Sequence, residues 1–128
     1  MLGVDTVVAL DQAVYGKPAD RGQAESTLRA LAGASHRVLS GICLIYGPPA
    51  RGDARTAVAT TTVRFRALDE PTLDWYLDAG EWRERAGGYA IQGRGGALVE
   101  SIEGDYLNVV GLPVAALLDL EPGLLRGR

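Results

Sequence analysis

An acidic residue, a hydroxyl and a lysine near the start of the chain have the types and spacing that phosphate chemistry requires. Asp5 and Thr6 stand side by side at the head of an apolar run, and Lys17 follows a short turn between Gly16 and Pro18. A carboxylate can activate water or bind a cation, and an ammonium group can neutralise phosphate oxygens. The pattern is typical of a metal-dependent phosphate hydrolysis site, but a solvated turn with incidental charges has the same pattern.

A β-hairpin would bring these groups together. If residues 4–10 form a strand and the chain reverses at the next two residues, then residues 14–16 return beside it. That return carries Lys17 back towards Asp5. The proline after the lysine cannot donate a ladder hydrogen bond, so the returning strand is predicted to end there. The valine content of the first strand predicts burial on both of its faces.

The remaining chain alternates between helix and strand patterns, which predicts an α/β fold with helices packed on a mixed sheet. Asp20 and Asp69 are predicted N-caps of two helices, and Gly80 is predicted to end the second. Gly41 interrupts an alternating pattern and indicates a bulge. The predicted strands cover residues 35–46, 56–67 and 97–102, and the predicted helices cover residues 21–31, 70–79 and 113–120. We expect a loop at residues 47–55 and a frayed tail after Glu121.

Composition narrows the class of protein. The net charge of −3 gives no electrostatic case for nucleic acid as a partner. No stretch approaches the ~20 apolar residues of a membrane span, and the first residues do not resemble a signal peptide. A single cysteine excludes an internal disulfide. We therefore expect a cytoplasmic protein of one domain that binds neither nucleic acid nor membrane.

Several residues that could do chemistry are assigned structural roles. Cys43 lies in an apolar run and is predicted to be a buried thiol, while His36 is predicted at the surface or in a cap. Trp75 and Trp82 are predicted to pack in the core. An acidic turn, which could alternatively bind a metal ion, comprises Glu100, Glu103 and Asp105.

Gln92 is the fourth candidate site residue. It lies in a stretch dense with glycine, where the backbone can approach a ligand closely. Its amide can donate and accept, which suits reading the edge of a nucleobase, although a turn glutamine satisfied by water is the alternative. The glycines from Gly93 to Gly96 have the wrong spacing for a dinucleotide-binding turn, and no helix is predicted to begin there. A single histidine offers no Ser-His-Asp arrangement.

Three stretches in order resemble the Maf family of nucleoside triphosphate pyrophosphatases. Residues 3–8 and 16–18, GVDTVV and GKP, are similar to the family's GADTVV...GKP signature. Residues 28–41, LRALAGASHRVLSG, are similar to its L..LSG..H.V.TG segment. Residues 83–113, RERAGGYAIQGRGGALVESIEGDYLNVVGLP, are similar to DKAGAYGIQG...ERIEGDYxNVVGLP. The IQG and GDYLNVVGLP forms resemble the subgroup that acts on dTTP and UTP.

The resemblance implies a Maf/inosine-triphosphatase-like fold and a function. The chain would be a hydrolase that converts dTTP and UTP, or modified pyrimidine nucleotides, to the monophosphate and pyrophosphate. A divalent cation such as Mg²⁺ or Mn²⁺ would assist, with ligands that the sequence does not identify. By resemblance, Asp5 would be the proton acceptor, Thr6 and Gln92 would contribute to base selection, and Lys17 would bind phosphate.

The sequence also departs from the family pattern. Arg85 stands where the family usually has lysine, which keeps the charge but changes the donor geometry. The family's serine-arginine loop, with the strand and helix that precede GADT, has no counterpart in residues 1–128. We therefore expect one Maf-like domain that is shortened at its N-terminus. Its exposed sheet edge would favour self-association as a homodimer. The alternative is an inactive remnant that binds nucleotide or a protein partner.

Overall fold

The computed structural model describes residues 2–45 and 54–126, and its strands form one antiparallel sheet. Within these residues the strand order is β2-β1-β3-β4-β5, and each neighbouring pair is antiparallel. The strands are β1 (Leu2–Leu10), β2 (Ala13–Tyr15), β3 (Ser35–Ile45), β4 (Ala54–Phe65) and β5 (Val99–Glu103). The predicted hairpin is confirmed, with Tyr15 pairing with Val8.

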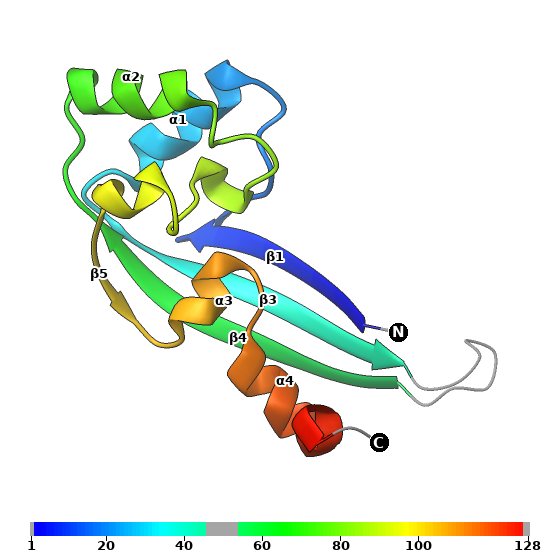
Figure 1. Cartoon of the computed structure of the whole chain (residues 1–128). Coiled ribbons are helices and arrows are strands. Elements are labelled where there is room, and N and C mark those ends of the chain that lie inside the picture. The colour runs from blue at the N-terminus through cyan, green and yellow to red at the C-terminus, as the bar shows by residue number, and fades with distance from the viewer. Residues whose placement is uncertain (1, 46–53, 127–128) are drawn as a thin grey trace.

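The helices complete the predicted α/β class (Figure 1). They are α1 (Arg21–Leu31), α2 (Glu70–Ala79), α3 (Tyr106–Val110) and α4 (Val114–Leu120), with the 3₁₀ turns η1 (Ala86–Gly88), η2 (Arg94–Leu98) and η3 (Pro122–Arg126). Figure 1 shows α1 and α2 together at one end of the sheet, while α3 and α4 follow β3 and β4 towards the other end. Among the described residues, no helix has the length and apolar character needed to cross a membrane.

Local capping explains why α1 and α2 begin where the sequence predicts. The Asp20 side chain accepts a hydrogen bond of 2.8 Å from the amide of Gln23. Asp69 accepts one of 2.9 Å from the amide of Thr72, and hydrogen bonding with the Thr72 side chain and then with this amide holds the pKa of Asp69 below its usual range. Gly80 ends α2 with a φ of 75°, a conformation that glycine adopts without steric cost.

The helices cover one face of the sheet. Along β3, every second side chain from His36 to Leu44 is buried, and the residues between them are half-buried or exposed. On the other face Val58 is 68% exposed. The prediction that β1 is buried on both faces is wrong, because β2 and the neighbouring turns cover only its last part. Val8 and Ala9 are buried there, whereas the first residues of the strand are exposed.

Three other expectations are corrected. Gly41 makes no bulge, since it pairs in register with Asp5 and Val58, and the sheet irregularity lies instead between Arg64 and Phe65. Residues 94–98 form a 3₁₀ turn, although no helix was predicted to begin there. Residues 122–126 form another where a frayed tail was predicted. The short helix α3 was not predicted. Of the expected loop at residues 47–55, residues 47–53 lie outside the described residues, and the last two belong to β4.

Burial overturns some of the structural roles predicted for single residues. His36 is 1% exposed and lies in the core, because it shares the inward face of β3. Cys43, on the opposite face, is only half-buried. Trp82 is in the core as predicted, whereas Trp75 is 44% exposed and has the Arg94 guanidinium 5.3 Å from its ring centre.

A close contact between the backbone of η1 and a side chain of β1 supplies a test. Gly87 has a φ of 70°, and a Cβ built on it would lie 2.7 Å from a methyl carbon of Val8. We expect Gly87→Ala to lower the free energy of unfolding by about 2–4 kcal/mol, because it adds backbone strain and overpacking together. Urea unfolding followed by circular dichroism measures this.

Gly41→Ala is the matched control. No atom lies within 4 Å of a Cβ built at Gly41, and its φ is ordinary. This substitution should change the free energy of unfolding by less than about 1 kcal/mol, in the stabilising direction if at all. Equal losses in the two variants would show that the contact between η1 and β1 is not tight in solution.

Candidate functional site

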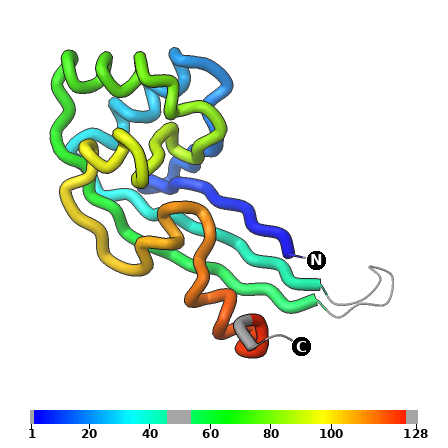
Figure 2. Tube along the Cα trace, viewed as in Figure 1, coloured from blue at the N-terminus to red at the C-terminus, as the bar shows by residue number. Residues whose placement is uncertain are grey.

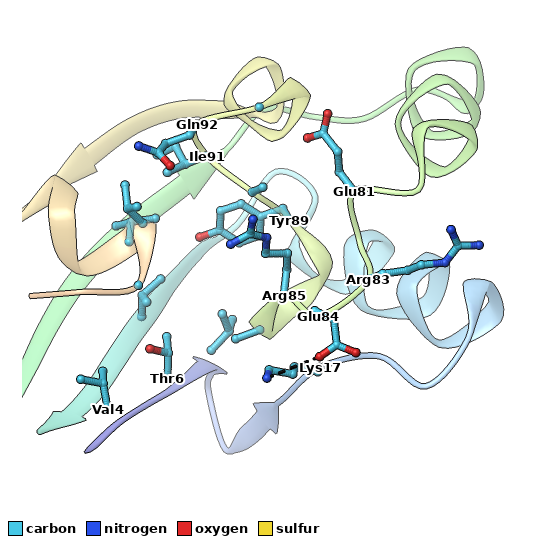
Figure 3. Close-up of a pocket in the computed structure, with 18 of the residues that line it drawn as sticks. Val4, Thr6, Lys17, Glu81, Arg83, Glu84, Arg85, Tyr89, Ile91 and Gln92 are labelled. Carbon is cyan, nitrogen blue, oxygen red and sulfur yellow. Dashed lines mark ion pairs between the residues drawn. The ribbon is translucent and has the colours of Figure 1, made fainter. Parts of the chain in front are cut away.

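A cleft of about 590 Å³ lies where the first hairpin, the segment from residue 81 to residue 93 and the end of α3 meet. All four residues singled out from the sequence line it: Asp5, Thr6, Lys17 and Gln92. Figure 3 shows three of them on separate segments, with Thr6 on β1, Lys17 after β2, and Gln92 in the loop that precedes η2. The structure therefore brings together residues that are up to 87 positions apart in the chain (92 − 5 = 87).

Asp5 and Thr6 take different places at the cleft because they are neighbours on one strand. Successive side chains of a strand point to opposite faces, and the register of β1 with β3 continues without a bulge. Thr6 is half-buried, and its hydroxyl lies 2.9 Å from the Ser40 hydroxyl on β3. Asp5 is exposed at the rim, where it also borders a shallow apolar depression on the other face of the sheet. The Asp5 carboxylate makes no hydrogen bond or ion pair with another described residue.

The hairpin places Lys17 at the cleft, close to β1, as predicted. It follows Tyr15 by two residues, so it lies beside the part of β1 that carries Thr6. Its ammonium nitrogen is 3.6 Å from a carboxylate oxygen of Glu84, and both side chains are well exposed. Such exposed ion pairs contribute less than about 1 kcal/mol. The pair therefore orients the lysine loosely and leaves it able to contact another anion.

The loop that carries Gln92 is fixed by buried hydrogen bonds to its backbone. The Tyr76 hydroxyl donates to the carbonyl of Gly88 (3.0 Å) and accepts from the amide of Ala90 (3.1 Å). Burial raises the pKa of Tyr76 well above its usual range, so the hydroxyl stays protonated and able to donate. The Glu81 carboxylate accepts from the amide of Arg94 at 2.8 Å. The Gln92 side chain is exposed at the tip of this rigid loop.

The glycines around Gln92 serve the packing of the loop itself. A Cβ at Gly93 would collide with the Glu81 carboxylate, and one at Gly95 would collide with the carbonyl of Ala90. Glycine density was interpreted from the sequence as room for a ligand. At these two positions the nearest atoms belong to the protein.

A buried aromatic cluster supports the cleft from beneath. Tyr89 lines the cleft and is 6% exposed, and its hydroxyl lies 2.7 Å from Nε2 of His36. The Phe65 ring meets both of them edge to face, at 4.9 Å from His36 and 4.8 Å from Tyr89. Burial lowers the pKa of His36 to about 4 and raises that of Tyr89 well above its usual range. Both groups are therefore uncharged at neutral pH.

The acidic residues of the cleft do not form a ready-made metal site. Within residues 2–45 and 54–126, no group of three or more His, Cys, Asp or Glu side chains is arranged to hold a metal ion. The acidic turn near β5, for which metal binding was the alternative interpretation, has two of its carboxylates engaged by the protein. Glu100 pairs with Arg64, and Asp105 caps α3. Asp5 remains as an uncommitted carboxylate at the rim. Mg²⁺ is commonly held by one or two carboxylates together with substrate phosphates, so Asp5 fits that kind of site.

The sequence interpretation missed the residues of α3 that close the cleft. Val109, Val110 and Gly111 line it, and α3 is held in place by Asn108. The Asn108 amide donates to the carbonyl of Val38 and to the Thr61 hydroxyl, each at 3.0 Å, so it joins α3 to β3 and β4. The cap at Asp105 was the available signal, but a helix of five residues has too few turns for a recognisable apolar face.

Comparison with known proteins agrees with the resemblance read from the motifs. The family described as "Maf-like protein" matches residues 1–121. The chain belongs to the Maf family. A dTTP/UTP pyrophosphatase of Pyrococcus furiosus is 43% identical over 120 residues, which cover 94% of this chain and 61% of the relative. A dTTP/UTP pyrophosphatase of Symbiobacterium thermophilum is 50% identical over 115 residues, which cover 89% of this chain and 57% of the relative.

This Maf chain spans about three fifths of the length of the curated relatives it matches. A third relative, from Anaeromyxobacter dehalogenans strain 2CP-C, carries the same name and is 46% identical, over 90% of this chain and 59% of the relative. Residues 1–121, which match the family, contain the hairpin, the loop of Gln92 and α3, which are the parts that form the cleft.

The buried histidine of this Maf domain predicts a pH dependence of stability. His36 is the single histidine of the chain, and its pKa falls from 6.5 to about 4 on folding because of burial. Between these pH values His36 binds a proton in the unfolded chain but not in the folded chain. The free energy of unfolding therefore decreases as the pH falls below about 6.5. We expect a loss of about 2 kcal/mol in the free energy of unfolding between pH 7.5 and pH 5.

Urea unfolding at the two pH values measures this loss, and His36→Phe is the comparison. The variant should show less than half of the wild-type loss, whatever its absolute stability. If both proteins lose the same free energy between pH 7.5 and pH 5, the histidine is not the group responsible.

Proposed function

We propose that this Maf domain hydrolyses dTTP and UTP, and related modified pyrimidine nucleotides, to the nucleoside monophosphate and pyrophosphate. The observation that carries the proposal is the single cleft lined by Asp5, Thr6, Lys17 and Gln92. The relatives named dTTP/UTP pyrophosphatase support the choice of substrate. No observation favours an inactive binding module over an enzyme.

The proposed reaction adds water across one anhydride bond. Water attacks phosphorus, the bond between phosphorus and the oxygen that bridges the α- and β-phosphates breaks, and pyrophosphate leaves. Asp5 accepts the proton that the water loses, for which an exposed carboxylate with no protein partner is suited. Lys17 offsets the charge that builds up on the phosphate oxygens.

We propose that a divalent cation, Mg²⁺ or Mn²⁺, enters with the nucleotide; phosphate oxygens would hold it, and one oxygen of the Asp5 carboxylate could contribute while the other stays available for the proton. When bound, such an ion would neutralise phosphate charge. We place the activity in the cytoplasm, where nucleoside triphosphates are made and consumed. We also keep the proposal of a homodimer, because β2 pairs with only the last three residues of β1 and leaves the rest of that edge without a described partner.

Asp5→Asn tests the proton acceptor. We expect pyrophosphate release from dTTP and UTP with Mg²⁺ to fall by about 10²–10⁴-fold, because general base catalysis contributes that much. The change is at an exposed side chain, so the free energy of unfolding should stay as in the wild type. The measurement is a coupled assay of pyrophosphate release under saturating substrate.

Asp11→Asn is the matched control for this variant. Asp11 is an exposed aspartate in the turn of the same hairpin and does not line the cleft, and its φ of 53° is one that asparagine tolerates. It should keep wild-type turnover. Full activity in Asp5→Asn would remove Asp5 from the mechanism, and no pyrophosphate release from any triphosphate by the wild-type chain would remove the proposed function.

Gln92 is proposed to read the edge of the base. Thymine and uracil share a carbonyl at position 4 and an N–H at position 3, and one amide can donate to the first while it accepts from the second. Cytosine presents the reverse pattern, with an amino group at position 4 and an acceptor at position 3. A single amide in one orientation therefore distinguishes dTTP and UTP from dCTP.

Gln92→Leu should lower the ratio of kcat/KM for dTTP to kcat/KM for dCTP by about tenfold, the effect of leaving one hydrogen-bonding edge unmatched. Steady-state kinetics with the two nucleotides give this ratio. Gln12→Leu replaces an exposed glutamine in the hairpin turn and should leave the ratio unchanged. An unchanged ratio in Gln92→Leu would assign base selection to other residues.

A further inference from the structure

Three basic side chains line the cleft, and their surroundings differ. Lys17 is ion-paired with Glu84. The Arg83 guanidinium stacks over Trp82, 5.0 Å from the ring centre, and Figure 3 shows it pointing away from the other labelled side chains. The guanidinium of Arg85 makes no hydrogen bond, ion pair or ring contact with the side chain or backbone of any other described residue. It is the cation of this part of the cleft that the described protein leaves uncommitted.

The backbone around Arg85 is held against the segment that carries Lys17. The amide of Gly87 donates to the carbonyl of Gly16 at 3.1 Å, and the amide of Gly88 donates to the carbonyl of Arg85 at 3.0 Å. The backbone of Gly87 also lies close to the side chain of Val8 on β1. Arg85 and Lys17 therefore start from backbone positions that are fixed relative to one another.

Glu84, directly before this arginine, has a φ of 60°, which is unusual for a residue other than glycine. Backbone conformations of this kind persist only where the surrounding structure determines them, and they cluster at ligand-binding sites. Here the left-handed conformation of Glu84 turns the chain so that its carboxylate meets Lys17, while the side chain of Arg85 enters the cleft. Figure 3 shows Arg85 between Tyr89 and the Lys17–Glu84 pair.

The acidic side chains that line the cleft differ in how they are paired. The Glu81 carboxylate accepts from the backbone of Arg94, and Glu84 partly offsets Lys17. Asp5 adds a negative charge at the rim. A triphosphate brings several negative charges, so the positive groups that face it need a contribution beyond a lysine already paired with a carboxylate. A guanidinium suits that role, since its planar fork can donate two parallel hydrogen bonds to one phosphate.

We propose that Arg85 binds the phosphate chain of the nucleotide, beside Lys17, as a second cation of the substrate site. The inference rests on the proposed function for the identity of the ligand, but it can be tested with a ligand that has no base. It divides the tasks among the residues that line the cleft. Lys17 and Arg85 contact the phosphates, and Thr6 and Gln92 contact the base.

The test is equilibrium binding of inorganic tripolyphosphate to the wild-type chain and to Arg85→Gln, measured by calorimetry with Mg²⁺ present. We expect the dissociation constant to rise by about 10- to 100-fold in Arg85→Gln, as for loss of a charged hydrogen-bonding group. Arg85→Lys should lie between the two, because lysine keeps the charge but loses the fork. Arg85 is exposed, so these changes should leave the unfolding curve where it is.

Arg83→Gln is the matched control, since it removes the same charge from an arginine two residues away whose guanidinium stacks on Trp82. It should change tripolyphosphate binding by less than about twofold, because screening weakens distant exposed charges. An equal loss in the Arg83 and Arg85 variants would mean general electrostatic attraction and would overturn the inference. So would unchanged binding in Arg85→Gln, or no binding of tripolyphosphate to the wild type.

The same proteins separate this inference from the proposed function. If the wild type binds tripolyphosphate through Arg85 but releases no pyrophosphate from dTTP or UTP, the phosphate site stands and the proposed enzyme activity fails. If the wild type hydrolyses dTTP and Arg85→Gln does so with the same KM, the activity stands and the role of Arg85 fails. A KM for dTTP that rises with the dissociation constant of tripolyphosphate supports both.

Discussion

The close contact between Gly87 and Val8 is the constraint on which the cleft depends. It is small, a backbone without a side chain lying against a valine, but it joins the segment from residue 81 to residue 93 to the hairpin. The hydrogen bond from the amide of Gly87 to the carbonyl of Gly16 reinforces it at the point where the hairpin continues into Lys17. Figure 2 follows the two segments, one near the start of the chain and one far along it, as they come together beside α1. Without this junction, the residues of the cleft would belong to two independent loops.

Buried polar groups extend that junction into a rigid frame. The Tyr76 hydroxyl on α2 accepts from one backbone amide of the loop and donates to one of its carbonyls, and the Tyr89 hydroxyl meets His36 on β3. Each of these groups would be costly to bury without its partner. The loop of Gln92 is therefore tied both to α2 and to the sheet, so the backbone that carries this glutamine has a defined position.

The parts of this structure that could be predicted from the sequence are those determined by neighbouring residues. Asp20 and Asp69 cap their helices through amides three residues away, and the two-residue turn after Leu10 sets the register that returns Lys17 to β1. Those local rules were enough to gather Asp5, Thr6 and Lys17. Gln92 was singled out by the glycines around it and by resemblance, but local rules could not place it beside the other three, because its position depends on contacts that no short stretch of sequence reveals.

The errors have the same physical origin. His36 was assigned to the surface as an isolated histidine, although it shares the inward face of β3 with Val38 and Ile42. The burial expected for β1 failed because a run of valines does not say how far the neighbouring elements extend along a strand. The short α3 was missed because it is stabilised by Asn108 reaching β3 and β4, and not by its own turns. For His36 and Asn108 the decisive partners are far away in the chain, since His36 meets Tyr89 and Asn108 meets Val38 and Thr61.

The alternation of a β-strand gives Asp5 and Thr6 environments that suit different tasks. Thr6 points to the helix side, where the Ser40 hydroxyl fixes it, and a group that selects a base benefits from being held still. Asp5 points the other way and remains at the rim, in contact with solvent and with no protein partner in the described structure. A group that takes a proton from water needs access to water and a carboxylate that is not already engaged. One residue of separation on one strand thus supplies both a rigid hydroxyl and an accessible carboxylate, provided that the strand keeps its register. The continuous pairing of β1 with β3 provides that register.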